Sequence, residues 1–298
     1  MKYLEQSKTS KLRQVTNKLY GGLELGWIAI ILLAVVSAVI TAVFLQVPVF
    51  KETSFERMGV DLEAWIFIAI FIMPNCKSAL DSALKTFVFF VISQPLIYLI
   101  QVPFSDMGWG LFSFYKNWVV LTLLTFPMAF VGWYIRKRSW LSLLIISSAL
   151  VFQTVVGVGA LIDTYYEPPR LIVTGIFCLG QVALFIFVFT ENKWQRLAGT
   201  AAVLIAAVVA FVMQSKVDIS GQATIPDGYS YSENAEISSD DPEIAEVSFA
   251  DPVEGFVQVN GKKYGTVTFT VTDGDKQEHF TLRIYMENGH SQMEIKPQ

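Results

Sequence analysis

The hydrophobic positions of this chain form a series of long, nearly uninterrupted runs. The first run, Trp27–Val47, is long enough to cross a hydrocarbon core of roughly 30 Å as a helix. Further runs follow at residues 64–79, 86–103, 118–135, 140–162, 171–190 and 197–213. Backbone amides in lipid must be hydrogen-bonded within their own segment, so each run is predicted to be a helix. The pattern therefore predicts a polytopic α-helical membrane bundle over residues 27–213.

Basic residues outside the runs predict how the bundle is oriented, because loops rich in Lys and Arg stay in the cytoplasm. They gather before the first run and between the fourth and fifth runs, at Lys8, Lys11, Arg13, Lys18, Arg136, Lys137 and Arg138. Both clusters can lie inside only if an even number of spans separates them. The short second run, with its apolar core at residues 64–73, is therefore counted as a crossing.

This count gives seven predicted spans, with the N-terminus inside and the C-terminus outside. The inside segments then carry twelve Lys and Arg residues, and the short outside loops carry four. All seven tryptophans lie at the ends of runs or in adjoining loops, as expected for residues at a membrane interface. The first run is too long for a cleavable signal peptide and is predicted to be a signal anchor.

Beyond Met213 the period of the pattern changes to two. Apolar residues alternate with threonine in 265–273 (GTVTFTVTD), and a similar alternation runs through 278–286 (EHFTLRIYM). Alternation of this kind is typical of half-buried strands, and the intervening Asp273-Gly274-Asp275 predicts a tight hairpin turn. Residues 214–230 are predicted to be a linker that merges into an edge strand. The expected core residues are Val247, Val267, Phe269, Val271, Phe280, Leu282 and Ile284.

The tail also resembles a known family. Residues 238–248 (SSDDPEIAEVS) are similar to the opening motif of bacterial Ig-like (group 2) domains, and 255–257, Gly261 and 265–271 are similar to its continuation. The resemblance covers about residues 214–290. It implies an all-β Ig-like sandwich of the kind found in bacterial surface proteins as a spacer or adhesion module. It implies no enzymatic site. Together with the predicted spans, it leads us to expect a multi-pass protein of a bacterial plasma membrane.

The tail and the rest of the chain also differ in net charge. The tail beyond Met213 carries six basic and fifteen acidic residues, whereas the remainder is net positive within an overall charge of −4. No basic patch with interleaved aromatic residues is present, so no nucleic-acid partner is expected. The predicted domains are a cytoplasmic basic segment at 1–26, a seven-helix membrane domain at 27–213 and an extracytoplasmic Ig-like domain with a short linker at 214–298.

Few polar side chains lie within the runs, and none of them assembles a recognised active site. Gln94, Gln153 and Gln181 are expected to make hydrogen bonds between helices, or to line a polar pocket. Intramembrane proteolysis needs a Ser–His pair, two Asp residues or a metal-binding His set, and these are not found in the runs. The sequence therefore predicts no catalytic residue, no metal site and no cofactor. The acidic residues of the tail lack the spacing of an EF-hand.

Small residues recur every four positions in the last run, at Ala198, Ala202, Ala206 and Ala210. Such a ridge lets helices approach closely, and it is predicted to pack within the bundle in preference to a second copy of the chain. The sequence leaves the oligomeric state open.

Three functions compete at this point. The first is a non-catalytic envelope protein that displays the Ig-like module for adhesion, assembly or sensing, with the bilayer and an envelope protein or glycan as partners. The second is a transporter or channel-like bundle with an accessory outer domain. The third is an enzyme acting on a lipid-linked substrate through loops such as 104–117. The scarcity of ionisable residues within the runs favours the first.

Overall fold

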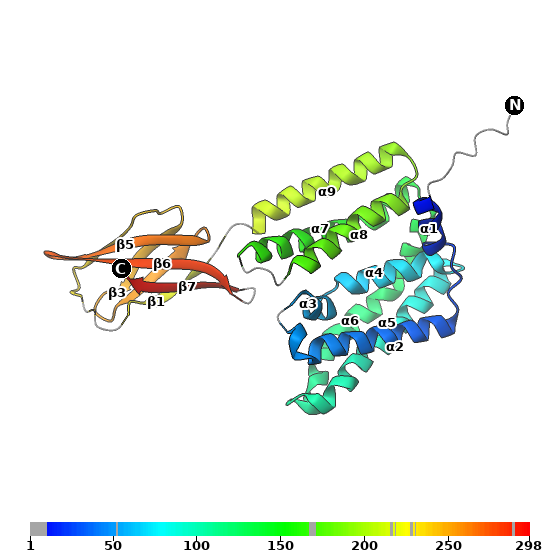
Figure 1. Ribbon diagram of the computed structural model, residues 1–298, viewed down its shortest axis with the longest axis horizontal. Helices are drawn as coiled ribbons and strands as arrows, with labels where there is room; N and C mark the ends of the chain where they lie inside the picture. Colours follow the sequence, from blue (N-terminus) through cyan, green and yellow to red (C-terminus); the bar gives the residue numbers. More distant parts are fainter. Residues whose placement is uncertain are drawn as a thin grey trace. The chain divides into compact units, whose positions relative to one another are not determined.

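The structure is a computed structural model that describes residues 11–51, 53–166, 171–214, 217, 219–226, 229, 231–287 and 290–298. Within these residues the chain forms nine α-helices followed by seven β-strands (Figure 1). The helices are α1 (Lys11–Leu19), α2 (Trp27–Gln46), α3 (Ser54–Val60), α4 (Glu63–Ile72), α5 (Ala79–Gln101), α6 (Phe112–Gly132), α7 (Trp140–Tyr166), α8 (Ile172–Phe189) and α9 (Lys193–Gln214). Short 3₁₀ turns, among them η2 (Met73–Asn75) and η5 (Trp133–Lys137), join several of them.

The chain divides into two compact units. The first contains Met1–Ala160 and Arg170–Val208, and the second contains Leu161–Pro169 and Val209–Gln298. The boundary between the units in this part of the chain lies within α9, between Val208 and Val209. Each unit is described below by itself.

The helical unit has the lengths and surface of a membrane bundle. Six described helices are long and apolar enough to cross a membrane, and the number is seven if the bent pair α3–α4 is counted as one span. Their outer faces expose large apolar side chains, such as Ile28 at 77 % and Leu144 at 70 %. Exposed apolar surface of this extent is unfavourable in contact with water and favourable in contact with lipid. These features are compatible with a multi-pass membrane protein.

Helix α5 lies between α2 and α6 and packs against both (Figure 1). One apolar core forms around Trp65 on α4, which lies against the rings of Phe89 and Phe90 on α5 at centroid distances of 6.2 and 6.0 Å. A second core forms where Phe185 and Phe189 of α8 pack with residues of α4 and α7. Helix α4 thus contributes to both cores.

The second predicted run, 64–79, falls on α4 and the 3₁₀ turn η2. A further short helix, α3, precedes it; α3 and α4 meet at a bend of 60°, and Asp61 between them has an extended backbone. The apolar core at 64–73 is too short to cross a bilayer alone. Together, α3 and α4 have the length and composition of a broken span or of a re-entrant loop. The sequence prediction of a span at 64–79 did not include α3.

The β unit contains two antiparallel sheets. The first has the strand order β1-β4-β3, with β1 at Ile219–Thr224, β3 at Ala245–Asp251 and β4 at Phe256–Gly261. The second has the order β2-β5-β6-β7, with β2 at Glu236–Ser239, β5 at Gly265–Asp273, β6 at Lys276–Glu287 and β7 at His290–Pro297. Strands β5 and β6 form the predicted hairpin, in which Asp273 pairs with Lys276 across Gly274, whose φ is +60°. Strand β1 is an edge strand, as the pattern predicted.

The expected core residues of the tail lie together between the sheets. Val247, Val267, Phe269, Val271, Phe280, Leu282 and Ile284 are all buried and belong to one apolar cluster. Phe269 stacks on Phe280 with a centroid distance of 5.4 Å. The alternation of β5 therefore places its apolar residues inward, and it leaves its threonines on the outer face of the sheet.

Candidate functional site

A buried carboxylate lies at the break between α3 and α4. Glu63 is the first residue of α4, and its side chain is 0 % exposed. Neither of its carboxylate oxygens makes a hydrogen bond within the part of the chain that the structure describes. A charged group buried in this way costs several kcal/mol or more unless something compensates it, so the position calls for an explanation.

Two glutamines from other helices converge on the same residue. Nε2 of Gln153 on α7 donates to the carbonyl oxygen of Glu63 at 3.0 Å and to Oε1 of Gln181 on α8 at 3.2 Å. Nε2 of Gln181 donates to the same carbonyl at 3.4 Å. Both side chains are almost fully buried, and Oε1 of Gln153 has no hydrogen-bond partner among the described residues.

The two glutamines fix the depth of this cluster in the bundle. Gln153 lies near the middle of α7 (Trp140–Tyr166), and Gln181 lies near the middle of α8 (Ile172–Phe189). Both helices are candidate spans. Because the carbonyl of Glu63 bonds to both amides, the start of α4 lies at the mid-depth of the apolar region and not at its surface.

Helix α8 also holds the other side of the break. The backbone N–H of Thr174 donates to Oγ of Ser54 at 3.1 Å, and Oγ1 of Thr174 donates to the carbonyl oxygen of Ser54 at 3.4 Å. Ser54 begins α3, and both residues are buried. Helix α8 therefore contacts the broken span at Ser54 and, through Gln181, at Glu63.

No hydrogen bond among the described residues joins the third predicted glutamine, Gln94, to this cluster. Gln94 lies on α5, is 2 % exposed, and its Nε2 has no hydrogen-bond partner in the described chain. Nε1 of Trp65 and Oγ of Ser93 share this property. Hydrogen bonds between helices are thus described for Gln153 and Gln181.

The helical unit also contains an apolar crevice of about 650 Å³. Its walls come from α4, α6 and α7, and they include Leu62, Ile66, Pro127, Val131 and Phe152. Leu62 and Phe152 directly precede Glu63 and Gln153 in the chain. Glu63, Gln153 and Gln181 are not among the residues that line the crevice.

A different set of polar residues joins the segments predicted to lie inside. Oδ1 of Asn75 accepts hydrogen bonds from the backbone N–H groups of Gly21 and Leu23 at 2.8 and 3.0 Å. Its Nδ2 donates to the carbonyl oxygens of Leu19 and Phe71 at 2.6 and 2.9 Å. This one side chain therefore fastens the end of α4 to the segment before α2.

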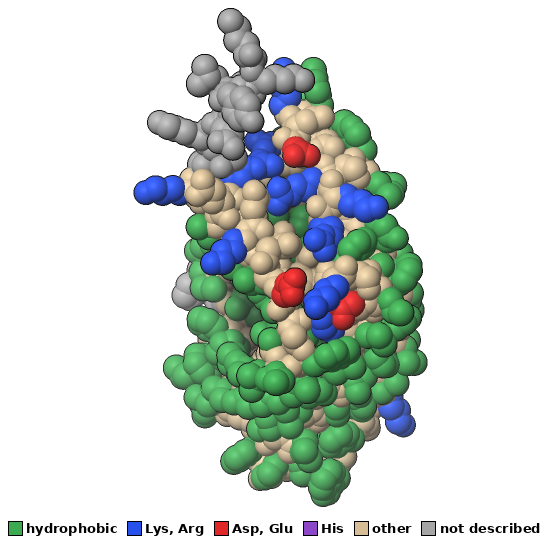
Figure 2. Space-filling model, turned by 90° about the vertical axis from the view of Figure 1, so that its right-hand side faces the viewer, with side chains coloured by type: hydrophobic (Ala, Val, Ile, Leu, Met, Phe, Trp, Pro, Cys, Tyr) green, Lys and Arg blue, Asp and Glu red, His purple; other side chains and the backbone are tan. Residues whose placement is uncertain are grey.

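The basic loops meet at the same end of the unit. Nη2 of Arg138 donates to Oδ1 of Asn17 at 2.7 Å, Nη2 of Arg13 donates to the carbonyl of Thr190 at 3.3 Å, and Nε2 of Gln195 donates to the carbonyl of Arg138 at 3.3 Å. Figure 2 shows Lys and Arg side chains gathered on this face, with apolar side chains below it. The exposed members include Lys11, Lys18, Arg136 and Lys137. Lys8 lies outside the described residues.

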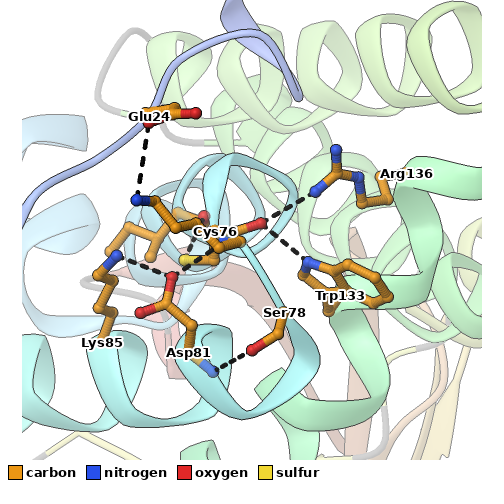
Figure 3. A network of polar contacts seen from close by, with 9 residues as sticks. Glu24, Cys76, Ser78, Asp81, Lys85, Trp133 and Arg136 are labelled. Atoms are coloured by element: carbon orange, nitrogen blue, oxygen red, sulfur yellow. Dashed lines mark hydrogen bonds and ion pairs between the residues drawn. The ribbon is translucent and has the colours of Figure 1, made fainter.

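The core of this basic end is drawn in Figure 3. The carbonyl oxygen of Cys76 accepts hydrogen bonds from Nε1 of Trp133 at 3.0 Å and from Nη1 of Arg136 at 2.9 Å. Asp81 and Lys85 on α5 form an ion pair at 2.8 Å, which satisfies a Lys side chain that is only 5 % exposed. Segments that lie far apart in the sequence, and that the charge pattern assigned to one side, therefore lie together.

The alanine ridge of α9 is not a uniformly buried face. Ala198 and Ala206 are half-buried, Ala202 is exposed and Ala210 is buried. A four-residue repeat advances about 400° at about 100° per residue, so it drifts about 40° around the helix at each step. The prediction of one continuous packing stripe is therefore wrong at Ala202.

Two acidic residues of the β unit, Asp251 and Asp273, accept hydrogen bonds from backbone N–H groups. Oδ1 of Asp251 accepts from the backbone N–H of Val253 at 3.0 Å, and Asp273 accepts from the N–H of Ser232 at 2.8 Å and from its Oγ. These bonds hold the pKa of Asp273 below its usual range, since they favour the charged form. Within the described residues, no three His, Cys, Asp or Glu side chains gather as a metal site.

Comparison with known proteins adds nothing to this geometry: no family model, no curated protein and no solved structure matches the chain. The sequence analysis named both glutamines of the cluster but missed Glu63. The available signal was the length of the apolar core at 64–73. Because that core cannot span a bilayer alone, its flanking residues, Glu63 included, have to enter the apolar region.

Proposed function

We propose that this protein is a multi-pass protein of a bacterial plasma membrane that displays an Ig-like module outside the cell. The observation that carries the proposal is the β unit, because it has two sheets and an apolar core of its own and directly follows the last candidate span. On this proposal the module serves adhesion, assembly or sensing without catalysis. Its partner is an envelope protein or glycan, and the helical unit anchors it in the bilayer.

The basic end of the helical unit supports the proposed orientation. The loops that meet there through Asn75, Arg138 and Gln195 are those that the positive-inside rule assigns to the cytoplasm. With α3–α4 counted as one crossing, an odd number of spans lies between α1 and the β unit. The N-terminus is then cytoplasmic and the module is external.

Complementation of a deletion strain tests the display proposal. A chain lacking residues 215–298 is expected to insert but to fail in restoring adhesion and resistance to envelope stress. The matched control is Gln94→Leu, which alters a buried amide of the bundle and leaves the module intact. Full restoration by the truncated chain would refute the proposal.

A second candidate function is favoured by one observation. Transporters place ionisable groups and discontinuous helices near the membrane midplane, where substrates and coupling ions bind. Glu63 lies at such a discontinuity, between α3 and α4. The helical unit is then a carrier, and the β unit is its accessory domain.

A further inference from the structure

We propose that Glu63, Gln153 and Gln181 form a binding site for a small monovalent cation, either a proton or an alkali-metal ion. The inference deepens the carrier candidate and rests on it for its physiological meaning. Binding at Glu63 is nevertheless measurable without transport. The site has three components: a buried carboxylate, amide oxygens from two further helices and a broken span.

The charge of the site comes from Glu63. Its side chain is 0 % exposed, and neither carboxylate oxygen has a hydrogen-bond partner within the described residues. A carboxylate in an apolar interior becomes neutral by taking up a proton, or it is compensated by a bound cation. A cation at this position removes the cost of burial, and this gives the site its affinity.

The two amides add oxygen atoms on helices that contact Glu63. Oε1 of Gln153 has no hydrogen-bond partner in the described chain, and Oε1 of Gln181 accepts one hydrogen bond, from Gln153. The Nε2 atoms of both residues donate to the backbone carbonyl oxygen of Glu63, so the amides are held beside the backbone of that residue. In membrane carriers, coupling ions bind near the bilayer midplane at interrupted helices.

The surrounding charges leave Glu63 available. On α3, Arg57 and the adjoining Asp61 form an ion pair with each other at 3.0 Å, and on α5 Lys85 pairs with Asp81. The titratable group of α8 near Glu63 is the thiol of Cys178. Helix α7 has no charged residue between Trp140 and Leu161.

Labelling of Glu63 needs a reagent that partitions into the apolar phase of the bilayer, because the side chain is 0 % exposed. Dicyclohexylcarbodiimide is such a reagent, and it reacts with protonated carboxyl groups in apolar surroundings.

The experiment uses the full chain in phosphatidylcholine liposomes, treated with dicyclohexylcarbodiimide over a series of pH values. The adduct at Glu63 is quantified by peptide mass spectrometry with choline chloride, NaCl, KCl or LiCl at equal ionic strength. We expect labelling that falls as the pH rises. An alkali-metal ion that binds is expected to lower labelling about tenfold at about ten times its dissociation constant.

Two variants make the result specific. Glu63→Gln should abolish the adduct, and Glu24→Gln, at an exposed carboxylate of the basic end, should not change it. Gln153→Leu should raise the concentration of alkali-metal ion needed for protection. A decrease with pH but no protection by any alkali-metal ion identifies the proton as the occupant.

Labelling that is absent, or that responds to neither pH nor any cation, would overturn the site. The carrier candidate is tested separately by flux of the protecting ion into the same liposomes. Protection without flux leaves the binding site standing and removes the carrier.

Discussion

Truncation of Phe269 to alanine tests the packing of the β unit most sharply. Phe269 is 0 % exposed and stacks on Phe280 between the two sheets. Replacing a fully packed Phe by Ala costs about 3–5 kcal/mol, because apolar transfer energy is lost and a cavity remains. The free energy of unfolding of a domain of this size is about 5–10 kcal/mol, so the substitution should remove a large share of it.

The assay is urea unfolding of residues 214–298, expressed without the helices and monitored by far-ultraviolet circular dichroism. With a slope of about 1 kcal/mol per molar urea, the midpoint should fall by about 3–5 M. Thr266→Ala is the matched control, since Thr266 lies on the exposed face of the same strand and should change the free energy of unfolding by only about 0.5 kcal/mol. Equal effects of the two substitutions, or a tail that is unfolded alone, would refute the proposed core.

Three further predictions concern single residues. The hydrogen bonds from Ser232 lower the pKa of Asp273, so the stability that this pair contributes is present above about pH 4 and is lost as the pH falls through the folded-state pKa. The urea midpoint of the Asp273→Asn variant should therefore change less between neutral and acidic pH than the midpoint of the wild type. A Cβ on Gly261 would lie 2.5 and 2.6 Å from two isoleucine side chains, so Gly261→Ala should destabilise the β unit by about 1–3 kcal/mol, and an unchanged midpoint would contradict this packing. Asn75→Ala should remove four hydrogen bonds and speed amide exchange in residues 19–23 of the full chain, as measured by mass spectrometry, and unaltered exchange there would contradict the described contacts.

Local patterns were sufficient to predict much of the fold. The alternation in 265–273 fixed which side chains of β5 face inward, because a strand turns successive residues to opposite faces. The long apolar runs likewise predicted α2 and α5–α9, since helix length in lipid follows from bilayer thickness. The order of apolar and polar residues along the chain carries both kinds of information.

The candidate site could be predicted only in part, because it depends on contacts between distant segments. Gln153 and Gln181 are recognisable as polar residues within apolar runs, but their hydrogen bonds to the carbonyl of Glu63 join residues 90 and 118 positions apart. In the sequence, Glu63 directly precedes the apolar core at 64–73, so the pattern predicts that it lies in a loop. Its burial becomes visible only when the bend between α3 and α4 is known.

The central claim is that the β unit lies outside the cell and the basic end lies inside. Cysteine labelling in intact cells tests it directly, with a membrane-impermeant maleimide and the exposed positions Ser248→Cys on β3 and Lys137→Cys in η5. The two native cysteines, Cys76 and Cys178, are buried and should give a low background. We predict that Ser248→Cys reacts in intact cells and that Lys137→Cys reacts only after permeabilisation. The reverse pattern, or protection of both positions, would contradict the proposed topology.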